Sequence, residues 1–158
     1  MYETRNDLAE PARKGIIQLL NDRLASAIDL QLQAKHAHWN VKGPNFVGLH
    51  ELFDRVAAAA SEYVDLIAER GVALGGVAEG TLQTVSSRST LPEYVVKGGE
   101  WTAHVEGMRT ALATFGSSAR RAIDEATGLE DADTADLFTE VSRGVDKLLW
   151  MVEAHVQK

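Results

Sequence analysis

The sequence predicts an all-α fold, a four-helix bundle with a long crossover between its second and third helices. Apolar residues recur at helical spacing through four long segments, and a Gly-Pro pair and a Gly-Gly pair end the first two of them. The links between the segments are short, long and short in that order. A long middle link has the length needed to cross the bundle, so simple up-and-down order is not expected.

The first two helices flank a short turn. The first is expected from about Pro11 to Asn40, and Gly43-Pro44 ends it. The second is expected from Phe46 to Leu74, with Asn45 as its N-cap and Gly75-Gly76 at its end. The first helix carries four apolar residues at helical spacing: Ile17, Leu20, Leu24 and Ile28.

The last two helices come after a connection over residues 77–98, which is rich in Gly, Ser and Thr. A short helical turn is expected in it around Pro92-Glu93-Tyr94. The third helix is expected from about Glu100 to Ala126, and the fourth from Asp133, as its N-cap, to about Val156. We therefore expect one ferritin-like domain over residues 1–158, with residues 1–10 as an N-terminal tail.

The composition excludes several classes of function. The chain has 158 residues, a net charge of -7 and no cysteine, which rules out disulfides, zinc-thiolate sites and thiol catalysis. An acidic chain is poorly suited to binding nucleic acid over its whole surface. No apolar run is long enough to span a membrane, and the N-terminus lacks the apolar segment of a secretory signal. We expect a cytoplasmic protein with no membrane contact.

The second helix carries a stripe of candidate metal ligands. With His50 at zero on a helical wheel, Asp54, Asp65 and Glu69 lie at about 40°, 60° and 100°. Imidazole together with carboxylates suits Fe(II), Mn or Zn. Such a stripe is costly to bury unless its groups bind a cation or pair with charges.

Spacing along the helix divides this stripe into two half-sites. Roughly 16 Å of helix rise separates the His50–Asp54 pair from the Asp65–Glu69 pair, so one metal ion cannot contact both. Two antiparallel copies of the helix, related by a two-fold axis at the Ala59-Ala60 peptide, would place each pair opposite the other pair of the second chain. The residues near that axis are small: Ala57, Ala58 and Ser61.

Two residues at the end of the first helix extend this hypothesis. His38 is a further candidate ligand, beside the turn that leads to His50. Trp39 could donate an electron to a reactive oxygen intermediate, or it is simply a packed tryptophan with its N–H satisfied. The alternative for the stripe is a solvated face, on which Asp65 and Glu69 pair with nearby arginines. Those arginines are Arg55 and Arg70.

Four strings of this sequence resemble the Dps family, the mini-ferritins also called DNA-binding proteins from starved cells. The strings are HWNVKGPNF at 38–46, LHELFD at 49–54, DLIAERGVALGG at 65–76 and DTADLFTEVSRGVDKLLWMVEAHV at 133–156. The resemblance implies a hollow homo-dodecamer with ferroxidase sites between two-fold-related subunits. It also implies hydrogen peroxide, in preference to oxygen, as the oxidant of one or two Fe(II) per site. The five implied ligand positions hold the expected residue types: His38, His50, Asp54, Asp65 and Glu69.

The resemblance also implies a three-fold pore lined by acidic residues that guide iron inward. The matching residues are Asp131, Asp136 and Asp146. Helix capping by Asp136 and a solvated helix face at Asp146 are the alternatives. DNA-binding members often carry a lysine-rich N-terminal arm, whereas only Met1, Tyr2 and Glu3 precede Thr4 here. Direct DNA binding is therefore not expected.

Two other functions compete with this one. The first is a nucleoid-associated structural protein that protects DNA with little catalysis. The second is a ferritin or bacterioferritin with its site inside each bundle, which needs Glu-x-x-His motifs on two helices. The nearest approach here, Glu100 to His104, has the wrong spacing. We expect an iron-storing ferroxidase that detoxifies iron under oxidative stress.

Overall fold

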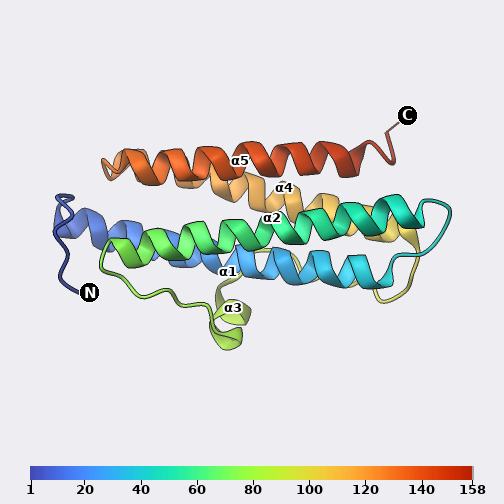
Figure 1. Ribbon diagram of the computed structural model, residues 1–158, viewed down its shortest axis with the longest axis horizontal. Helices are drawn as coiled ribbons and strands as arrows, with labels where there is room; N and C mark the ends of the chain where they lie inside the picture. The colour runs from blue at the N-terminus through green and yellow to red at the C-terminus, as the bar shows by residue number, and fades with distance from the viewer. Residues whose placement is uncertain (158) are drawn as a thin grey trace.

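The computed structural model describes residues 1–157 and contains five helices (Figure 1). They are α1 (Glu10–Asn40), α2 (Phe46–Ala73), α3 (Leu82–Arg88), α4 (Trp101–Gly128) and α5 (Ala132–Glu153). Helix α1 packs against α2, and α4 packs against α5; contacts of α1 with α4 and of α2 with α5 join the two pairs. The predicted all-α bundle is confirmed.

The crossover from α2 to α4 runs back along the whole bundle (Figure 1). It begins at Gly75, whose φ of +87° lies in the left-handed region and whose Cα faces the Tyr2 carbonyl too closely for a side chain. It ends beside the α1–α2 turn, where the N–H of Lys42 donates to the Gly99 carbonyl at 2.7 Å. Helix α4 therefore begins at the end of the bundle where α1 ends, which is the ferritin-like order.

The expected helical turn around Pro92 is wrong. The short helix of the crossover is α3, earlier in the chain, and it packs on α1 with Val85 buried. Around Pro92 the chain is extended, and its carbonyl accepts a hydrogen bond from the Gln33 side chain of α1 at 3.1 Å. Proline also disfavours helical geometry in the residue before it.

The expected N-caps of two helices also need correction. Asp131 caps α5, because its carboxylate accepts from the backbone N–H of Thr134 at 3.1 Å, so the helix begins before the expected cap, Asp133. Asp131 is buried and pairs with Arg70 of α2 at 2.7 Å, whereas Asp133 is exposed and lies 3.6 Å from Arg70. Asn45 precedes α2 as expected, but its side chain makes no cap hydrogen bond.

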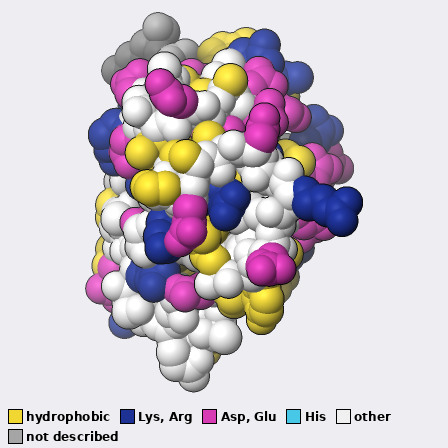
Figure 2. Space-filling model, turned by 90° about the vertical axis from the view of Figure 1, so that its left-hand side faces the viewer, with side chains coloured by type: hydrophobic (Ala, Val, Ile, Leu, Met, Phe, Trp, Pro, Cys, Tyr) yellow, Lys and Arg dark blue, Asp and Glu magenta, His cyan; other side chains and the backbone are white. Residues whose placement is uncertain are grey.

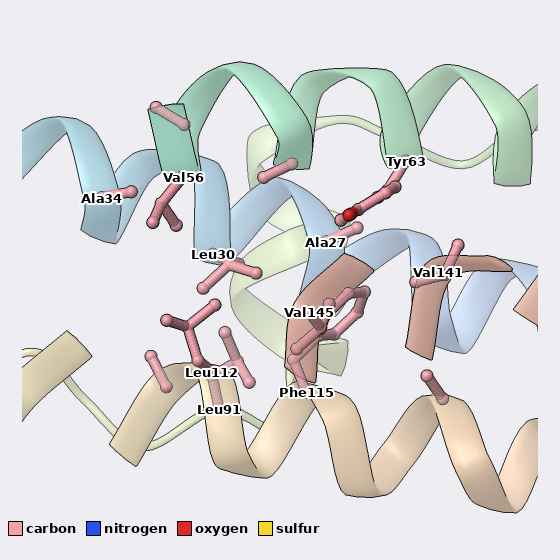
Figure 3. Packing of buried hydrophobic residues seen from close by; sticks show 14 of the residues in the cluster. Ala27, Leu30, Ala34, Val56, Tyr63, Leu91, Leu112, Phe115, Val141 and Val145 are labelled. Carbon is pink, nitrogen blue, oxygen red and sulfur yellow. The ribbon is translucent and has the colours of Figure 1, made fainter. Parts of the chain in front are cut away.

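Buried apolar residues from the four long helices form one core. Figure 3 shows Leu30 of α1, Val56 of α2, Phe115 of α4 and Val145 of α5 within it. Fully burying one such large side chain stabilises the fold by roughly 1.5–3 kcal/mol. In residues 1–157 the buried carboxylate is that of Asp131, at the start of α5, so the middle of the bundle lacks the ligands of a ferritin centre.

The segment before α1, expected as a tail, lies against the bundle. The backbone N–H of Tyr2 donates to the Gly75 carbonyl at 2.7 Å. The Arg13 guanidinium donates to the carbonyls of Asn6 and Leu8 at 3.2 and 3.1 Å. Within residues 1–157, no helix combines the length and apolar composition that crossing a membrane requires.

A fully buried histidine fastens the end of the crossover to α4. His104 Nε2 lies 2.7 Å from the Gly98 carbonyl and therefore donates to it, while the Tyr94 hydroxyl lies 2.9 Å from Nδ1. This pattern fits a neutral imidazole that accepts the tyrosine proton. Burial lowers the pKa of His104 below its ordinary value of 6.5, and His36 nearby acts in the same direction.

The buried imidazole makes stability depend on pH. Because the folded-state pKa is the lower one, the unfolded chain binds the proton more readily below pH 6.5. Above pH 6.5, His104 therefore does not change the stability of the fold. Below it, the fold loses stability as the pH falls toward the folded-state pKa of His104. We expect the melting temperature of the wild type to fall more between pH 7 and pH 5 than that of His104→Gln, whose amide can keep both hydrogen bonds. An equal fall in both proteins would contradict this account.

Candidate metal centre

The two histidines expected as ligands hold each other across the α1–α2 turn. His38 Nδ1 lies 2.7 Å from the His50 carbonyl, and His50 Nδ1 lies 2.8 Å from the His38 carbonyl. Their rings stack with centroids 3.7 Å apart. Because a carbonyl only accepts, both Nδ1 atoms must be the protonated ones. In the neutral form of each ring, Nε2 then keeps a free lone pair, the state in which an imidazole binds a metal.

The turn itself explains this arrangement. The His38 carbonyl belongs to the last turn of α1, where the helix offers it no N–H partner. His50 lies in the first turns of α2 and supplies that partner. Gly43, at a φ of +121°, allows the chain to reverse, and the Trp101 ring covers it. The His38 carbonyl at the end of α1 thus orients the His50 imidazole by accepting its hydrogen bond.

Asp54 lies one turn beyond His50 and is exposed. Its Oδ1 accepts from the Lys35 ammonium at 2.7 Å. This hydrogen bond is the main cause that holds the pKa of Asp54 below its ordinary value, and the charges of Lys35, His38 and His50 act in the same direction. The carboxylate is therefore ionised and ready to bind a cation, but Lys35 already occupies one oxygen.

Trp39 is 67% exposed, with its ring 5.8 Å from the Lys35 ammonium. Its ring is not part of the core, so a packed tryptophan is not what the single chain contains. The side chain lies at the same helix end as His38. Its part in electron donation stays a prediction.

The second half-site has unpaired carboxylates. Asp65 and Glu69 are exposed on α2, and neither forms an ion pair or side-chain hydrogen bond within residues 1–157. Arg70, one of the arginines considered as their partner, instead donates to Asp131 at 2.7 Å and to the Thr134 hydroxyl at 3.0 Å. Two adjacent carboxylates without a cation have the composition of an incomplete metal site.

A single chain does not complete the centre. Within residues 1–157, no three side chains of His, Cys, Asp or Glu come together in a way that could hold a metal ion. His50 and the Asp65–Glu69 pair lie at different points along α2, as the spacing predicts, and His38 lies at the end of α1. Whether a second chain unites them stays a prediction.

Two exposed valines on α2 join the candidate contact surface, although sequence reasoning missed them. Val47 is 64% exposed and Val72 is 54% exposed, and both lie near the metal-ligand stripe on the helical wheel. They are equally far in sequence from the Ala59-Ala60 peptide, as are His50 and Glu69, and Asp54 and Asp65. Exposed apolar residues at symmetric positions fit a self-complementary helix pair. Their arrangement about that midpoint is the signal that could have identified them.

The three acidic residues expected at a pore differ in their surroundings. Asp131 is buried, and both of its oxygens are used by Arg70 and Thr134. Asp146 accepts from Arg120 at 2.8 Å, and Asp136 is exposed on the same helix, α5. Their lining of a pore stays a prediction. Figure 2, which views the end of the bundle where α1 begins, shows acidic and basic side chains interspersed there.

Comparisons with known proteins agree with the fold. Residues 17–158 match the family model of the ferritin-like domain. The chain is 43% identical over 157 residues to the DNA protection during starvation protein of Agrobacterium fabrum, covering 99% of this chain and 97% of that protein. It is 32% identical over 152 residues to the protein of the same name from Mycolicibacterium smegmatis, covering 95% and 81%.

Solved structures give the same result. The tetragonal form of Mycobacterium smegmatis Dps superposes with a TM-score of 0.94 at 30% identity, covering 99% of this chain and 95% of that one. DpsA14 from Streptomyces coelicolor superposes with a TM-score of 0.93 at 32% identity, covering 99% and 92%. The fold and these comparisons therefore define a ferritin-like protein. Within that class, the chain belongs to the Dps family.

Proposed function

We propose that this chain is a ferroxidase and an iron store, with active sites shared between two-fold-related subunits of a hollow homo-dodecamer. The observation that carries the proposal is the reciprocal bonding of His38 and His50, which leaves both Nε2 atoms free for a metal ion. Membership of the Dps family supports iron as that metal and hydrogen peroxide as the preferred oxidant. A cytoplasmic location belongs to the same proposal.

The unpaired carboxylates support the sharing of the site. Asp65 and Glu69 lack a cationic partner within residues 1–157, and Asp54 is the remaining carboxylate near the histidines. An antiparallel second chain would bring its Asp65 and Glu69 to the His38–His50 pair. Glu69 of that chain is best placed to bridge two Fe(II) ions, and Asp54 would hold the more weakly bound one. The exposed Val47 and Val72 would be covered by the same contact.

The proposed reaction uses two Fe(II) ions as substrates. Each gives up one electron, the O–O bond of one hydrogen peroxide breaks, and two protons complete two water molecules. Because both electrons reach the same peroxide, no hydroxyl radical is released. Fe(III) then collects inside the shell. Trp39, exposed beside His38, would supply an electron when a single unpaired oxidant forms at the site.

Iron would reach the interior along α5. Asp136 and Asp146 are exposed on this helix; Asp136 has no partner within residues 1–157, whereas a cation would compete with Arg120 for Asp146. Asp131 is the third acidic residue that the resemblance assigns to the pore, although its oxygens already accept hydrogen bonds from Arg70 and Thr134. Its contribution to the path would be to fix the start of α5 rather than to bind ions.

The names of the relatives mention protection of DNA. In this chain, such protection would come from the removal of iron rather than from direct binding to DNA. Two of the three basic residues near the N-terminus already have partners: Lys14 pairs with Glu10 at 2.6 Å, and Arg13 donates to two backbone carbonyls, whereas Arg5 is exposed. Phosphate contacts need several free cationic side chains on one surface. Coating of DNA without catalysis is therefore the second candidate.

The test removes one half-site. The double variant His50→Ala, Asp54→Ala is expected to oxidise Fe(II) at least about 100-fold more slowly with peroxide, because loss of metal ligands removes the metal's binding energy. The absorbance of Fe(III) in a stopped-flow experiment measures the rate, and light scattering measures the mass of the assembly. The matched control is His155→Ala, Asp124→Ala, which removes the same residue types elsewhere. A wild-type rate in the first variant would refute the site.

A further inference from the structure

The Tyr94 hydroxyl is hydrogen-bonded to a buried, neutral imidazole. It lies 2.9 Å from His104 Nδ1, while His104 Nε2 donates to the Gly98 carbonyl at 2.7 Å. Because Nε2 carries the ring proton, Nδ1 is the basic nitrogen and accepts the phenol proton. The His104 carbonyl, at 3.3 Å, is a second and longer acceptor for the same hydroxyl. Burial raises the pKa of Tyr94 above its ordinary value of 10.0, so the phenol keeps its proton at neutral pH.

Gly107, one turn after His104 on α4, makes room for this pair. A Cβ atom at Gly107 would lie 2.7 Å from Tyr94 Cε2, so the tyrosine ring packs directly on the helix backbone. The ring also meets His36 of α1 edge to face, with the ring centroids 5.5 Å apart. Contacts from α1 and α4 therefore fix the phenol against its base, although nothing in the sequence marks Tyr94.

The other two tyrosines of the chain lack such a base. Tyr2 is 71% exposed near the N-terminus. Tyr63 is buried on α2 and points into the bundle (Figure 3), where its hydroxyl faces Gly144 and makes no side-chain hydrogen bond within residues 1–157. Loss of an electron makes a phenol strongly acidic, so a tyrosine is oxidised most readily where a positioned base takes the proton. Tyr94 is the tyrosine that meets this condition.

Tyr94 lies at the end of the bundle that carries the proposed metal centre. His36, which its ring contacts, is two residues before His38 on α1. The crossover that bears Tyr94 continues to Gly99, whose carbonyl accepts from Lys42 in the α1–α2 turn. Electrons move through proteins between neighbouring aromatic rings. An oxidant formed at the metal centre can therefore draw an electron from Tyr94.

We propose that Tyr94 and His104 form a redox pair that removes one-electron oxidants formed at the metal centre. A single Fe(II) ion that meets hydrogen peroxide transfers one electron, which yields Fe(III), hydroxide and a hydroxyl radical. The O–H bond of Tyr94 then breaks: the electron reduces the hydroxyl radical to hydroxide, and the proton moves to His104 Nδ1. The products are a neutral tyrosyl radical and an imidazolium, which donates back to the phenoxyl oxygen. The inference rests on the proposed function, because the oxidant arises at that site.

The experiment records freeze-quenched EPR spectra of the assembled protein after peroxide is mixed with less Fe(II) than the proposed sites can hold. We expect a tyrosyl signal in the wild type, which should narrow when the protein is made with ring-deuterated tyrosine. Tyr94→Phe should lose this signal. The matched control is Tyr63→Phe, which also removes a buried hydroxyl and should keep the signal, as should Tyr2→Phe. Light scattering checks that every variant has the wild-type mass.

A second variant tests the proton acceptor and keeps the test valid if Tyr94→Phe fails to assemble. The amide of His104→Gln can keep the hydrogen bonds to Tyr94 and Gly98, but it does not take up a proton at neutral pH. The tyrosyl radical should form roughly 100-fold more slowly in this variant, because a positioned base contributes about 10²–10⁴-fold to a proton transfer. High-field EPR should also show a larger highest g value for any radical that remains, since no imidazolium donates to its oxygen.

A photochemical oxidant that needs no iron separates this inference from the proposed function. Ruthenium tris-bipyridine, excited by light in the presence of persulfate, should produce the same tyrosyl signal at Tyr94. That signal in a protein that does not oxidise Fe(II) would overturn the proposed function, and the link to the metal centre with it. Rapid oxidation of Fe(II) with no tyrosyl signal in the wild type, or with a signal that survives in Tyr94→Phe, would overturn the inference alone. Equal rates of radical formation in His104→Gln and the wild type would overturn the role of His104.

Discussion

Combining two inactive variants, His50→Ala/Asp54→Ala and Asp65→Ala/Glu69→Ala, is expected to restore about a quarter of the wild-type rate of Fe(II) oxidation. The expectation comes from two-fold symmetry with random pairing: about half of the dimers contain one chain of each kind, and one of the two sites in such a dimer has all its ligands. Each variant alone should be inactive. Coexpression with two different affinity tags isolates assemblies that contain both chains.

The same experiment excludes a site built from one chain. If each chain carried a complete centre, no combination of the two variants could recover activity. The control is a mixture of the two variants that were assembled separately, which should stay inactive as long as subunits do not exchange. The shared site would be contradicted if mixed assemblies of wild-type mass oxidised Fe(II) no faster than either variant alone.

Replacing Asp131 by alanine should destabilise the fold by about 3–5 kcal/mol, because it leaves the largely buried Arg70 guanidinium with only the exposed Asp133 carboxylate, 3.6 Å away, as an ionic partner. The Arg70 side chain is 18% exposed and donates to Asp131 at 2.7 Å. The same change removes the N-cap of α5, which contributes about 1 kcal/mol of that loss. Urea unfolding at fixed chain concentration measures the effect.

The other two acidic residues provide the comparison. Asp136→Ala should change stability by less than about 0.5 kcal/mol, since its exposed carboxylate has no partner in residues 1–157. Asp146→Ala loses an exposed pair with Arg120 and should cost no more than about 1 kcal/mol. If Asp131→Ala were as stable as these two but took up iron more slowly, Asp131 would line the path instead of fixing α5.

The Asp131 network also predicts how acid affects the fold. Burial alone would raise the pKa of Asp131, but hydrogen bonds from Thr134 and Arg70 outweigh it, so the pKa lies below its ordinary value of 3.8. The stabilisation is therefore present above that value and is lost as the pH falls through the folded-state pKa. It acts at lower pH than the His104 effect, so the two can be separated along one acid titration.

Most of the fold could be predicted from the sequence because its signals are local and repeated. The apolar periodicity of Ile17, Leu20 and Leu24 predicts a helix, and all three are on α1. The Gly75-Gly76 pair predicts where α2 ends, and Gly75 has the left-handed φ that only glycine adopts easily. Link lengths then determine the connection order without any information about packing.

The missed elements depend on contacts between distant residues. Helix α3 lies in a polar connection, and what holds it is Val85 against α1, which no periodicity in seven residues reveals. By residue type, Asp131 and Asp133 suit the cap of α5 equally well. Arg70, far away in sequence on α2, forms its shorter pair with Asp131, at 2.7 Å against 3.6 Å for Asp133, and so favours Asp131.

The candidate site divides in the same way. The spacing of His50, Asp54, Asp65 and Glu69 predicts two half-sites, and the single chain indeed contains no complete metal-binding group within residues 1–157. Spacing could not show that His38 and His50 bond to each other's carbonyls, since the geometry of the turn decides this. Nor could it show that Lys35 contacts Asp54 across two helices.

The hydrogen-bonded histidines have a consequence for how the proposed active site assembles. His38 and His50 are 12 positions apart, so their contact forms as soon as one turn closes, and short loops close in well under a microsecond. The Asp65–Glu69 pair needs only a single helix. Under the proposed function, the slow step is then the encounter of two chains, whose frequency rises with concentration. Under the same proposal, a newly made chain would be folded but inactive, and iron oxidation would start only once the shell that stores its product is assembling.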